Sequence, residues 1–463
     1  RPVPVRGYWT STIRSLTRGD DSNLLAIEVP NTPELLRDYQ DLVYPGAAKP
    51  RNAAPLDMNL DRRRRHVVVI SLETAPGPYY PILNNPDLPN FTRMSQAGIS
   101  TKRHYSNTPF TTWAVYTMLS GTYPAPGGRL AKYGPFRTDG LANVLQGQGY
   151  QTTFIDSYKI DWVIGMQTHQ FTWRHLGFDN LVDNADSEYV KSATSNYDRK
   201  VKSEEKSFAN ALTAITRAES EKKHAVVFLA TLLGHYKWPA PPGQECEPAE
   251  TKLERIASVY DRLIGEFMDN LERAALLDDT IIVVTGDHGL RYQNEFESLA
   301  ADSRDHEAAF NVPFALYAPG IFDSGIELPY VTSHVDITPT LLDLLGVDIA
   351  GMYHHGNSML DPTTADRVTF MMNTQLSPTD WLHWDGNVLS YNNLTDQLRF
   401  IRKSESADEF ERLMMDRYGS ARHLFNAANS HFATSAARSL KLGASEGWDA
   451  SRAALSSSEE PSP

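Results

Sequence analysis

Four short apolar runs, separated by helical stretches, restrict what this chain can fold into. The first is 66–72 (HVVVISL), and similar runs rich in β-branched residues stand at 224–230, 280–285 and 313–317. Continuous apolar strands are typical of a parallel sheet that helices cover on both faces. Helices are expected around 90–97, 111–119, 138–147, 205–218, 250–275 and 338–345. This alternation predicts an α/β fold with a doubly wound, mostly parallel sheet sandwiched by helices.

The pattern changes after about residue 366. Short strand-like runs at 367–371, 387–391 and 396–401 predict a small antiparallel sheet, and a helical stretch follows. We therefore expect four parts, which are an N-terminal arm or linker (1–65), a catalytic domain (66–365), a small α+β subdomain (366–445) and a tail (446–463). The tail is too polar to pack and is expected to be disordered.

Charge and composition exclude several classes of protein. The net charge of -13 argues against a general nucleic-acid binder. The single cysteine, Cys246, permits neither an intramolecular disulfide nor a cysteine-built metal site. No run approaches the ~18 apolar residues that a membrane helix needs. Because the chain opens at Arg1 and not at methionine, we expect a processed or truncated product with a signal or membrane anchor upstream.

Groups able to bind a metal or an anion follow three of the four apolar runs. Glu73 follows the first, His235 comes shortly after the second, and Asp287 and His288 follow the third. In open α/β sheets, reactive groups collect beyond the carboxyl ends of the strands. Two carboxylates and an imidazole suit one divalent ion such as Mn, Zn or Mg. The alternative, that each is an isolated polar cap, is weakened because all three strand ends carry such groups.

A nucleophile is expected at Thr111, where a turn leads into a helix that stops at Gly121 and Pro124. A helix N-terminus offers a positive dipole end and unpaired N–H groups, which suit a phosphate. A threonine hydroxyl ionises poorly near neutral pH unless a metal lowers its pKa. The alternative is that Thr111 is only an N-cap.

Five motifs in one order resemble the alkaline phosphatase superfamily, in its sulfatase-like branch, from about residue 66 to about 402. They are the first strand with its acid, Leu119-Ser-Gly-Thr-Tyr-Pro124, Gly286-Asp-His-Gly289, Asn311-Val-Pro-Phe-Ala-Leu-Tyr317, and the segment from Ser333-His-Val-Asp336 to Gly346. Thr111 stands where sulfatases carry a cysteine or serine that is oxidised to formylglycine. Here the segment reads Thr-Thr-Trp-Ala-Val, which excludes formylglycine chemistry.

A threonine there is similar to lipoteichoic acid synthases, phosphoethanolamine transferases and nucleotide pyrophosphatases. Two-metal phosphodiesterases carry an aspartate where this chain has Thr231, so the resemblance implies one metal. It also implies that Glu73, Thr111, Asp287 and His288 bind that metal and that His235 contacts the phosphoryl oxygens. Phosphoethanolamine transferases usually carry disulfides, so the branch that transfers or hydrolyses glycerol phosphate resembles this chain best.

Substrate-binding candidates lie in two further segments. Arg304 or His306 could replace the substrate-binding lysine of sulfatases, and the alternative is a solvated loop. Lys237 and Trp238 offer a cation and an aromatic wall beside His235, or belong to a packed loop. His334 and Asp336, part of the fifth motif, are expected to hold a helix start.

The sequence thus predicts a metal-dependent phosphotransferase or phosphodiesterase that forms a phospho-threonine. Its expected substrates are glycerol-phosphate-type or phospholipid headgroup esters, or a glycan, in the cell envelope. The expected location is extracytoplasmic, in the periplasm or at the outer face of the inner membrane, with membrane contact only through the upstream anchor. The alternatives are a hydrolase of small phosphate or sulfate esters, and an inactive sulfatase-like binding domain.

Overall fold

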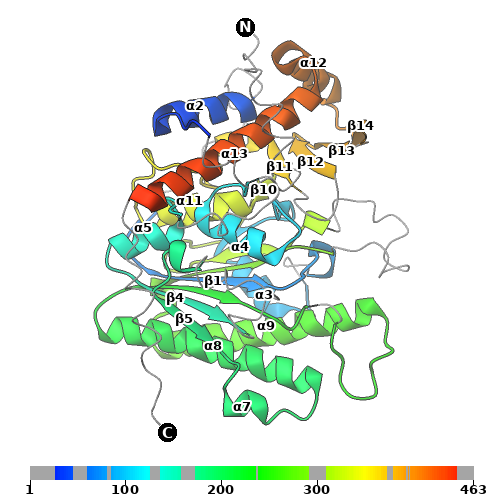
Figure 1. Cartoon of the computed structure of the whole chain (residues 1–463). Coiled ribbons are helices and arrows are strands. Elements are labelled where there is room, and N and C mark those ends of the chain that lie inside the picture. Colours follow the sequence, from blue (N-terminus) through cyan, green and yellow to red (C-terminus); the bar gives the residue numbers. More distant parts are fainter. Residues whose placement is uncertain are drawn as a thin grey trace.

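The computed structural model describes residues 27–44, 60–80, 85–125, 136–157, 173–235, 238–290, 309–372, 379–392, 395 and 397–445. An eight-stranded sheet lies at its centre (Figure 1), in the order β5-β4-β6-β1-β7-β8-β2-β9. The five strands at one side run parallel, and they are β5 (Asn180–Asp183), β4 (Gln151–Asp156), β6 (Ala225–Ala230), β1 (His66–Leu72) and β7 (Thr280–Gly286). The other three are β8 (Phe314–Tyr317), which runs antiparallel to both of its neighbours, β2 (Gly98–Ser100) and β9 (Ile326–Glu327).

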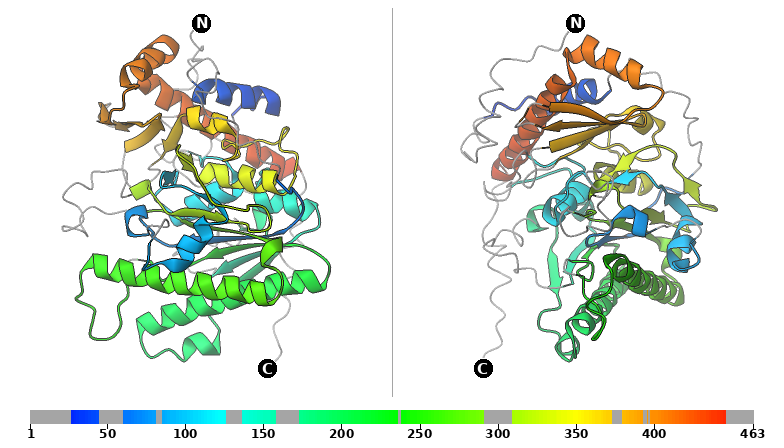
Figure 2. Two further views of the ribbon diagram at one scale, coloured as in Figure 1. Left: turned by 180° about the vertical axis from the view of Figure 1, so that it is seen from behind. Right: turned by 90° about the vertical axis from the view of Figure 1, so that its right-hand side faces the viewer.

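Helices cover both faces of the sheet because both faces of its central strands are apolar. In β1, Val67 and Val69 belong to one buried cluster, and Val68 and Ile70 to another. The first cluster includes residues of α4 (Thr111–Ser120), α5 (Leu141–Gly147) and α11 (Ile337–Leu344). The second includes residues of α3 (Pro89–Ser95), α8 (Asn196–Ser220) and α9 (Ala249–Arg273). Figure 2 shows α8 and α9 side by side beneath the sheet. The predicted α/β class is confirmed.

The C-terminal region forms a four-stranded antiparallel sheet that two helices and an N-terminal helix accompany (Figure 1). Its strands are β11 (Thr369–Met371), β12 (Thr379–Trp384), β13 (Asn387–Asn392) and β14 (Gln397–Arg402). The helices are α12 (Ala407–Tyr418), α13 (Ala421–Ser445) and α2 (Thr32–Val43), and α2 lies against α13. β12 was not predicted, because the polar residues Asp380 and His383 interrupt its apolar residues. The predicted tail lies outside the described residues.

The remaining elements are short. They are α7 (Glu188–Lys191), the strand pair β3 (His104–Tyr105) and β10 (Thr332–Ser333), and the 3₁₀ turns η2 (Gly77–Tyr79), η4 (Leu277–Asp279), η6 (His334–Asp336) and η7 (Pro362–Asp366). Among the described residues, no helix combines the length and the apolar character needed to span a bilayer.

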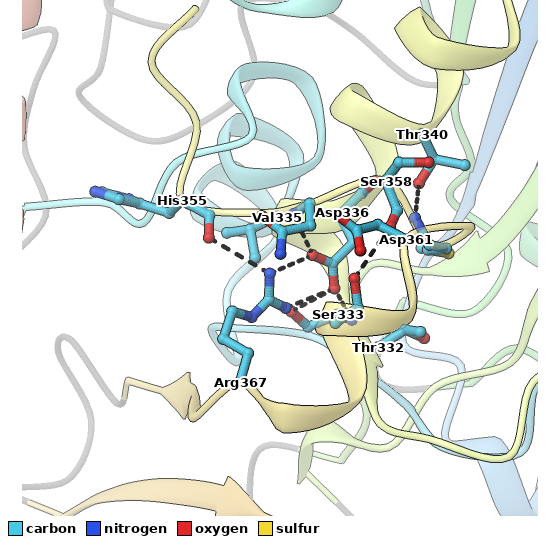
Figure 3. Close-up of polar contacts among 12 residues, drawn as sticks. Thr332, Ser333, Val335, Asp336, Thr340, His355, Ser358, Asp361 and Arg367 are labelled. Carbon is cyan, nitrogen blue, oxygen red and sulfur yellow. Dashed lines mark hydrogen bonds and ion pairs between the residues drawn. The ribbon is translucent and has the colours of Figure 1, made fainter. Parts of the chain in front are cut away.

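A buried ion pair joins the C-terminal region to η6 (Figure 3). Arg367 donates from Nη1 to Asp336 Oδ1 at 2.6 Å and from Nη2 to Oδ2 at 2.8 Å, and both side chains are fully buried. Asp336 also closes a capping box with Ser333 at the start of η6. His334 Nε2 lies 3.0 Å from the carbonyl oxygen of Gly286, the last residue of β7. His334 and Asp336 therefore occupy the helix-start positions that the sequence predicts.

Candidate metal and nucleophile site

The carboxyl ends of neighbouring parallel strands bring the expected ligands to one edge of the sheet. In the pairing of β1 with β7, Leu72 lies opposite Gly286, so Glu73 and Asp287 leave the sheet side by side. On its other side β1 pairs with β6, and the loop after β6 carries His235. The register of the sheet, which the apolar runs set, thus fixes where these side chains start.

Glu73, Asp287 and His288 form a compact group in which one ligand atom from each lies within 4.8 Å of the others. His288 Nε2 is 3.4 Å from Asp287 Oδ2 and 3.7 Å from Glu73 Oε1. All three side chains are buried, and buried carboxylates are costly without a compensating positive charge. Within the described ranges, this is the one cluster of at least three His, Cys, Asp or Glu residues arranged to hold a metal.

Hydrogen bonds orient the ligands of this group. His288 Nδ1 lies 2.7 Å from the carbonyl oxygen of Gly289. Because a carbonyl only accepts, Nδ1 carries the proton and the lone pair of Nε2 points toward the carboxylates, as in metal-binding histidines. Asp287 Oδ1 accepts from the backbone N–H groups of Thr74 (2.8 Å) and His288 (2.7 Å). These donor atoms fit one divalent cation of the Mn, Zn or Mg type.

Thr74 is a site residue that was not predicted from the sequence. Its backbone has φ of 47°, a left-handed conformation that a β-branched residue adopts at a cost of ~1–3 kcal/mol. In this conformation Thr74 donates its N–H to Asp287 and its hydroxyl to Glu73 Oε1 at 2.7 Å. The strain is therefore tied to holding both carboxylates. Its position directly after Glu73 was the only signal that the sequence offered.

Thr111 lies beside the ligand group at the start of α4. Its Oγ1 donates to Glu73 Oε2 at 3.1 Å and lies 3.4 Å from His288 Nε2. The N-cap of α4 is Phe110, so Thr111 is the first helical residue and not the cap that the alternative interpretation required. The structure thus brings together all four residues that the resemblance named as metal ligands.

The other predicted substrate contacts are His235, Lys237, Trp238, Arg304 and His306. His235 is half-buried in a turn in which its N–H donates to Leu232 O at 2.9 Å. Trp238 is buried in the apolar cluster between the sheet and α9, which fits the packed-loop alternative better than an open aromatic wall. Lys237, Arg304 and His306 lie outside the described residues.

Thr231, at the position of the missing aspartate, makes structural hydrogen bonds. Its Oγ1 accepts from the N–H of Glu73 at 2.9 Å and from the hydroxyl of Tyr260 at 2.7 Å. A hydroxyl with these two donors keeps little capacity for a second cation. This geometry favours the single-metal interpretation.

The sulfatase family model matches residues 65–347. The chain therefore belongs to the sulfatase family, and it shares the fold of a solved protein of the alkaline phosphatase superfamily.

Solved structures and curated relatives fit this assignment. The chain resembles an alkaline phosphatase superfamily protein from Vibrio parahaemolyticus (TM-score 0.62, 19% identity, covering 88% of this chain and 96% of that one). It also resembles a lipoteichoic acid synthase from Listeria monocytogenes (TM-score 0.56, 15% identity, 92% and 97% covered). Lipoteichoic acid synthase 1 of Bacillus subtilis is 24% identical over 59% of this chain and 44% of its own length. Arylsulfatase K of Mus musculus is 32% identical over 21% and 18%. The chain spans less than half the length of these curated relatives.

Proposed function

We propose that this protein is a metal-dependent phosphotransferase or phosphodiesterase in which Thr111 is the nucleophile. The observation that supports it most directly is the position of Thr111 Oγ1, 3.1 Å from Glu73 Oε2 and 3.4 Å from His288 Nε2 at a helix N-terminus. A threonine there is not a precursor of formylglycine, so we assign the attack to its own hydroxyl. Members of the family act by phosphoryl or sulfuryl transfer or hydrolysis.

In the proposed reaction the residues of the chain have separate tasks. When bound, a divalent cation would supply positive charge that lowers the pKa of a nearby hydroxyl. Glu73 Oε2 already accepts the hydrogen bond from Thr111, so it can take the proton as Oγ1 attacks. The new Oγ1–P bond forms as the bond from phosphorus to the leaving alcohol breaks in line. That alcohol takes a proton from a neighbouring acid, for which His235 and His306 are the candidates.

The phospho-threonine is then resolved by a second attack at phosphorus. Water gives hydrolysis, and an acceptor hydroxyl gives transfer. In both cases the Oγ1–P bond breaks, the attacking oxygen gives its proton to the residue that protonated the leaving alcohol, and Thr111 takes its proton back from Glu73. The N–H groups of the first turn of α4 suit the phosphoryl oxygens in both steps. Because both outcomes share the first half-reaction, the residues of the site do not separate them.

We propose glycerol-phosphate-type or phospholipid headgroup esters of the cell envelope as substrates. The proposal rests on the threonine of the site and on the likeness to lipoteichoic acid synthases. An extracytoplasmic location follows from such a substrate, and the upstream anchor stays a prediction.

A mass shift on Thr111 would test the assignment. The Mn²⁺-loaded protein is incubated with phosphatidylglycerol and then digested, and the peptide that contains Thr111 is measured by mass spectrometry. We expect added glycerol phosphate in the wild type and none in Thr111→Ala, which should also lose turnover. The matched control is Thr112→Ala, which removes the neighbouring hydroxyl of the same helix turn and should retain the adduct. A fully active Thr111→Ala variant would refute the assignment.

A second candidate function is hydrolysis of small phosphate or sulfate esters. It is favoured by matches to Arylsulfatase K and to a choline-sulfatase of Rhizobium meliloti. Bare phosphate on Thr111 from a phosphomonoester, with no adduct from phosphatidylglycerol, would support it. An inactive binding domain is disfavoured because the group of Glu73, Asp287 and His288 is intact; absence of stoichiometric metal would revive it.

A further inference from the structure

We propose that Lys200 and Glu204, one turn apart on α8, form a clamp that positions the loop 231–235, and through it His235, against the metal and nucleophile site. Both are positioning residues, because they contact the loop backbone and not the reacting atoms. The inference rests on the proposed function, since it concerns how His235 is held for phosphoryl contact. Neither residue stands out in the sequence, because both lie inside a helix that is rich in charged residues.

The clamp contacts both kinds of backbone group in the loop. Glu204 Oε1 accepts from the N–H groups of Leu232 and Leu233, each at 2.6 Å. Lys200 Nζ donates to the carbonyl oxygens of Leu232 at 3.3 Å and His235 at 3.1 Å. The two side chains thus bind backbone N–H groups at the start of the loop and backbone carbonyl groups as far as His235. Contacts at both places restrict rotation of the loop as a unit.

The opposite side of the loop lies against Glu73. The N–H of Glu73 donates to Thr231 Oγ1 at 2.9 Å. A Cβ placed on Gly234 would lie 1.8 Å from the carbonyl oxygen of Glu73, so only glycine fits there. The loop is therefore held between the clamp on α8 and the backbone of Glu73, a candidate metal ligand. Any shift of the loop relative to α8 changes where His235 stands with respect to the site.

Further hydrogen bonds hold the Glu204 carboxylate. Ser157 donates its hydroxyl to Oε2 at 2.6 Å, and the Tyr260 hydroxyl lies 3.3 Å from Oε1. The Tyr260 hydroxyl also lies within hydrogen-bonding distance of Thr231 Oγ1 (2.7 Å) and of the N–H of Gly234 (3.2 Å). Tyr260 thus links Glu204 to Thr231 and Gly234, the two loop residues that lie against the backbone of Glu73.

Two buried ionisable side chains are a costly way to hold a loop. Glu204 is fully buried and Lys200 is 8% exposed. Burial raises the pKa of Glu204 to about 7 and lowers the pKa of Lys200 to about 8. Apolar packing of similar volume often holds a loop equally well or better. Retention of the pair beside the site fits a role in defining one loop position, and the negative charge of Glu73 favours the protonated Lys200.

A double-mutant cycle tests the clamp. Turnover of bis(p-nitrophenyl) phosphate by the Mn²⁺-loaded protein is measured for Lys200→Met, His235→Ala and the double variant. We expect Lys200→Met to lower kcat by about tenfold or more, in the range seen when groups that orient an active site are removed, with a smaller change in KM. If Lys200 acts through His235, the same substitution should cost little in the His235→Ala background.

The matched control is Lys202→Met, on the same helix. Lys202 Nζ contacts Ser192 and Asp198, away from the loop, so this variant should keep wild-type kinetics. Additive effects of Lys200→Met and His235→Ala would overturn the proposal, and so would equal kinetics for Lys200→Met and Lys202→Met. If Lys200→Met does not fold, Tyr260→Phe takes its place, and a loss of kcat that vanishes in the His235→Ala background is again expected.

Inorganic phosphate separates this proposal from the proposed function. The affinity of the Mn²⁺-loaded protein for phosphate should fall in Lys200→Met and in His235→Ala. In the double variant it should fall no further than in His235→Ala alone. A wild-type protein that forms no Thr111 adduct but shows this pattern would refute the nucleophile and leave the clamp standing. A protein that forms the adduct, with unchanged phosphate affinity and kcat in Lys200→Met, would refute the clamp alone.

Discussion

Removal of the Thr74 hydroxyl should weaken metal binding without changing the fold. Thr74→Val replaces the hydroxyl by a methyl group of similar size. Both residues are β-branched, so the backbone strain at φ of 47° stays nearly the same. The N–H of residue 74 still donates to Asp287 Oδ1. The substitution removes only the 2.7 Å hydrogen bond from the hydroxyl to Glu73 Oε1.

The size of the effect follows from that hydrogen bond. A hydrogen bond to a charged group contributes about 1.5–3 kcal/mol. Without it, the Glu73 carboxylate can rotate away from the orientation in which Oε2 faces Thr111. If most of this free energy acts on the metal-bound state, the dissociation constant should rise about 10- to 100-fold, because 1.4 kcal/mol corresponds to a factor of ten.

Competition with a fluorescent chelator for Mn²⁺ or Zn²⁺ would measure this change. Thr74→Ser is the matched control, because it keeps the hydroxyl donor and should bind metal within a few-fold of the wild type. Unfolding by urea without metal should show similar cooperativity in all three proteins. A Thr74→Val variant that binds metal as tightly as Thr74→Ser would show that the hydroxyl does not position Glu73.

Two further predictions concern stability. Arg367→Met leaves the buried Asp336 carboxylate without its cation and should lower the free energy of unfolding by about 3–5 kcal/mol. Urea denaturation measures this loss, with the exposed Arg262→Met variant as the control. A loss below about 1 kcal/mol, the usual range for surface pairs, would contradict the prediction. Burial lowers the pKa of His431 to about 3; the folded state then binds fewer protons than the unfolded state below about pH 6.5, so stability present above that pH is lost as pH falls toward 3. Between pH 6.5 and 5 this effect of His431 lowers the free energy of unfolding by about 2 kcal/mol. Urea unfolding at the two pH values should therefore show a loss of stability that is about 2 kcal/mol smaller in His431→Gln than in the wild type. Equal losses in the two proteins would contradict the prediction.

The class of fold and the ligand group were predictable because they depend on local patterns. The apolar runs that became β1, β6, β7 and β8 differ from the observed strands by one residue at most at either end. Parallel strands place their carboxyl ends at one edge of the sheet. The residues that follow these strands therefore lie close together, however the helices pack. This is why Glu73, Asp287 and His288 could be named together, whereas the family resemblance added Thr111 to them.

Only the tertiary structure placed the residues that orient this site. Lys200 and Glu204 are two of many charged residues on α8, and their burial depends on which face of the helix meets the sheet. Trp238 is buried for a similar reason, since the path of the chain after His235 is not set by local sequence.

The sequence by itself thus determined the α/β sheet and the candidate metal ligands at its edge, because apolar periodicity and strand direction are properties of short segments. Tertiary structure decided which charges are buried beside that edge and how they are paired. Arg367 and Asp336, on separate elements, meet only when the C-terminal sheet docks, and Thr74 adopts its strained backbone beside Asp287, which is distant in the chain. Such contacts depend on how distant segments pack, and no short segment of the sequence contains that information.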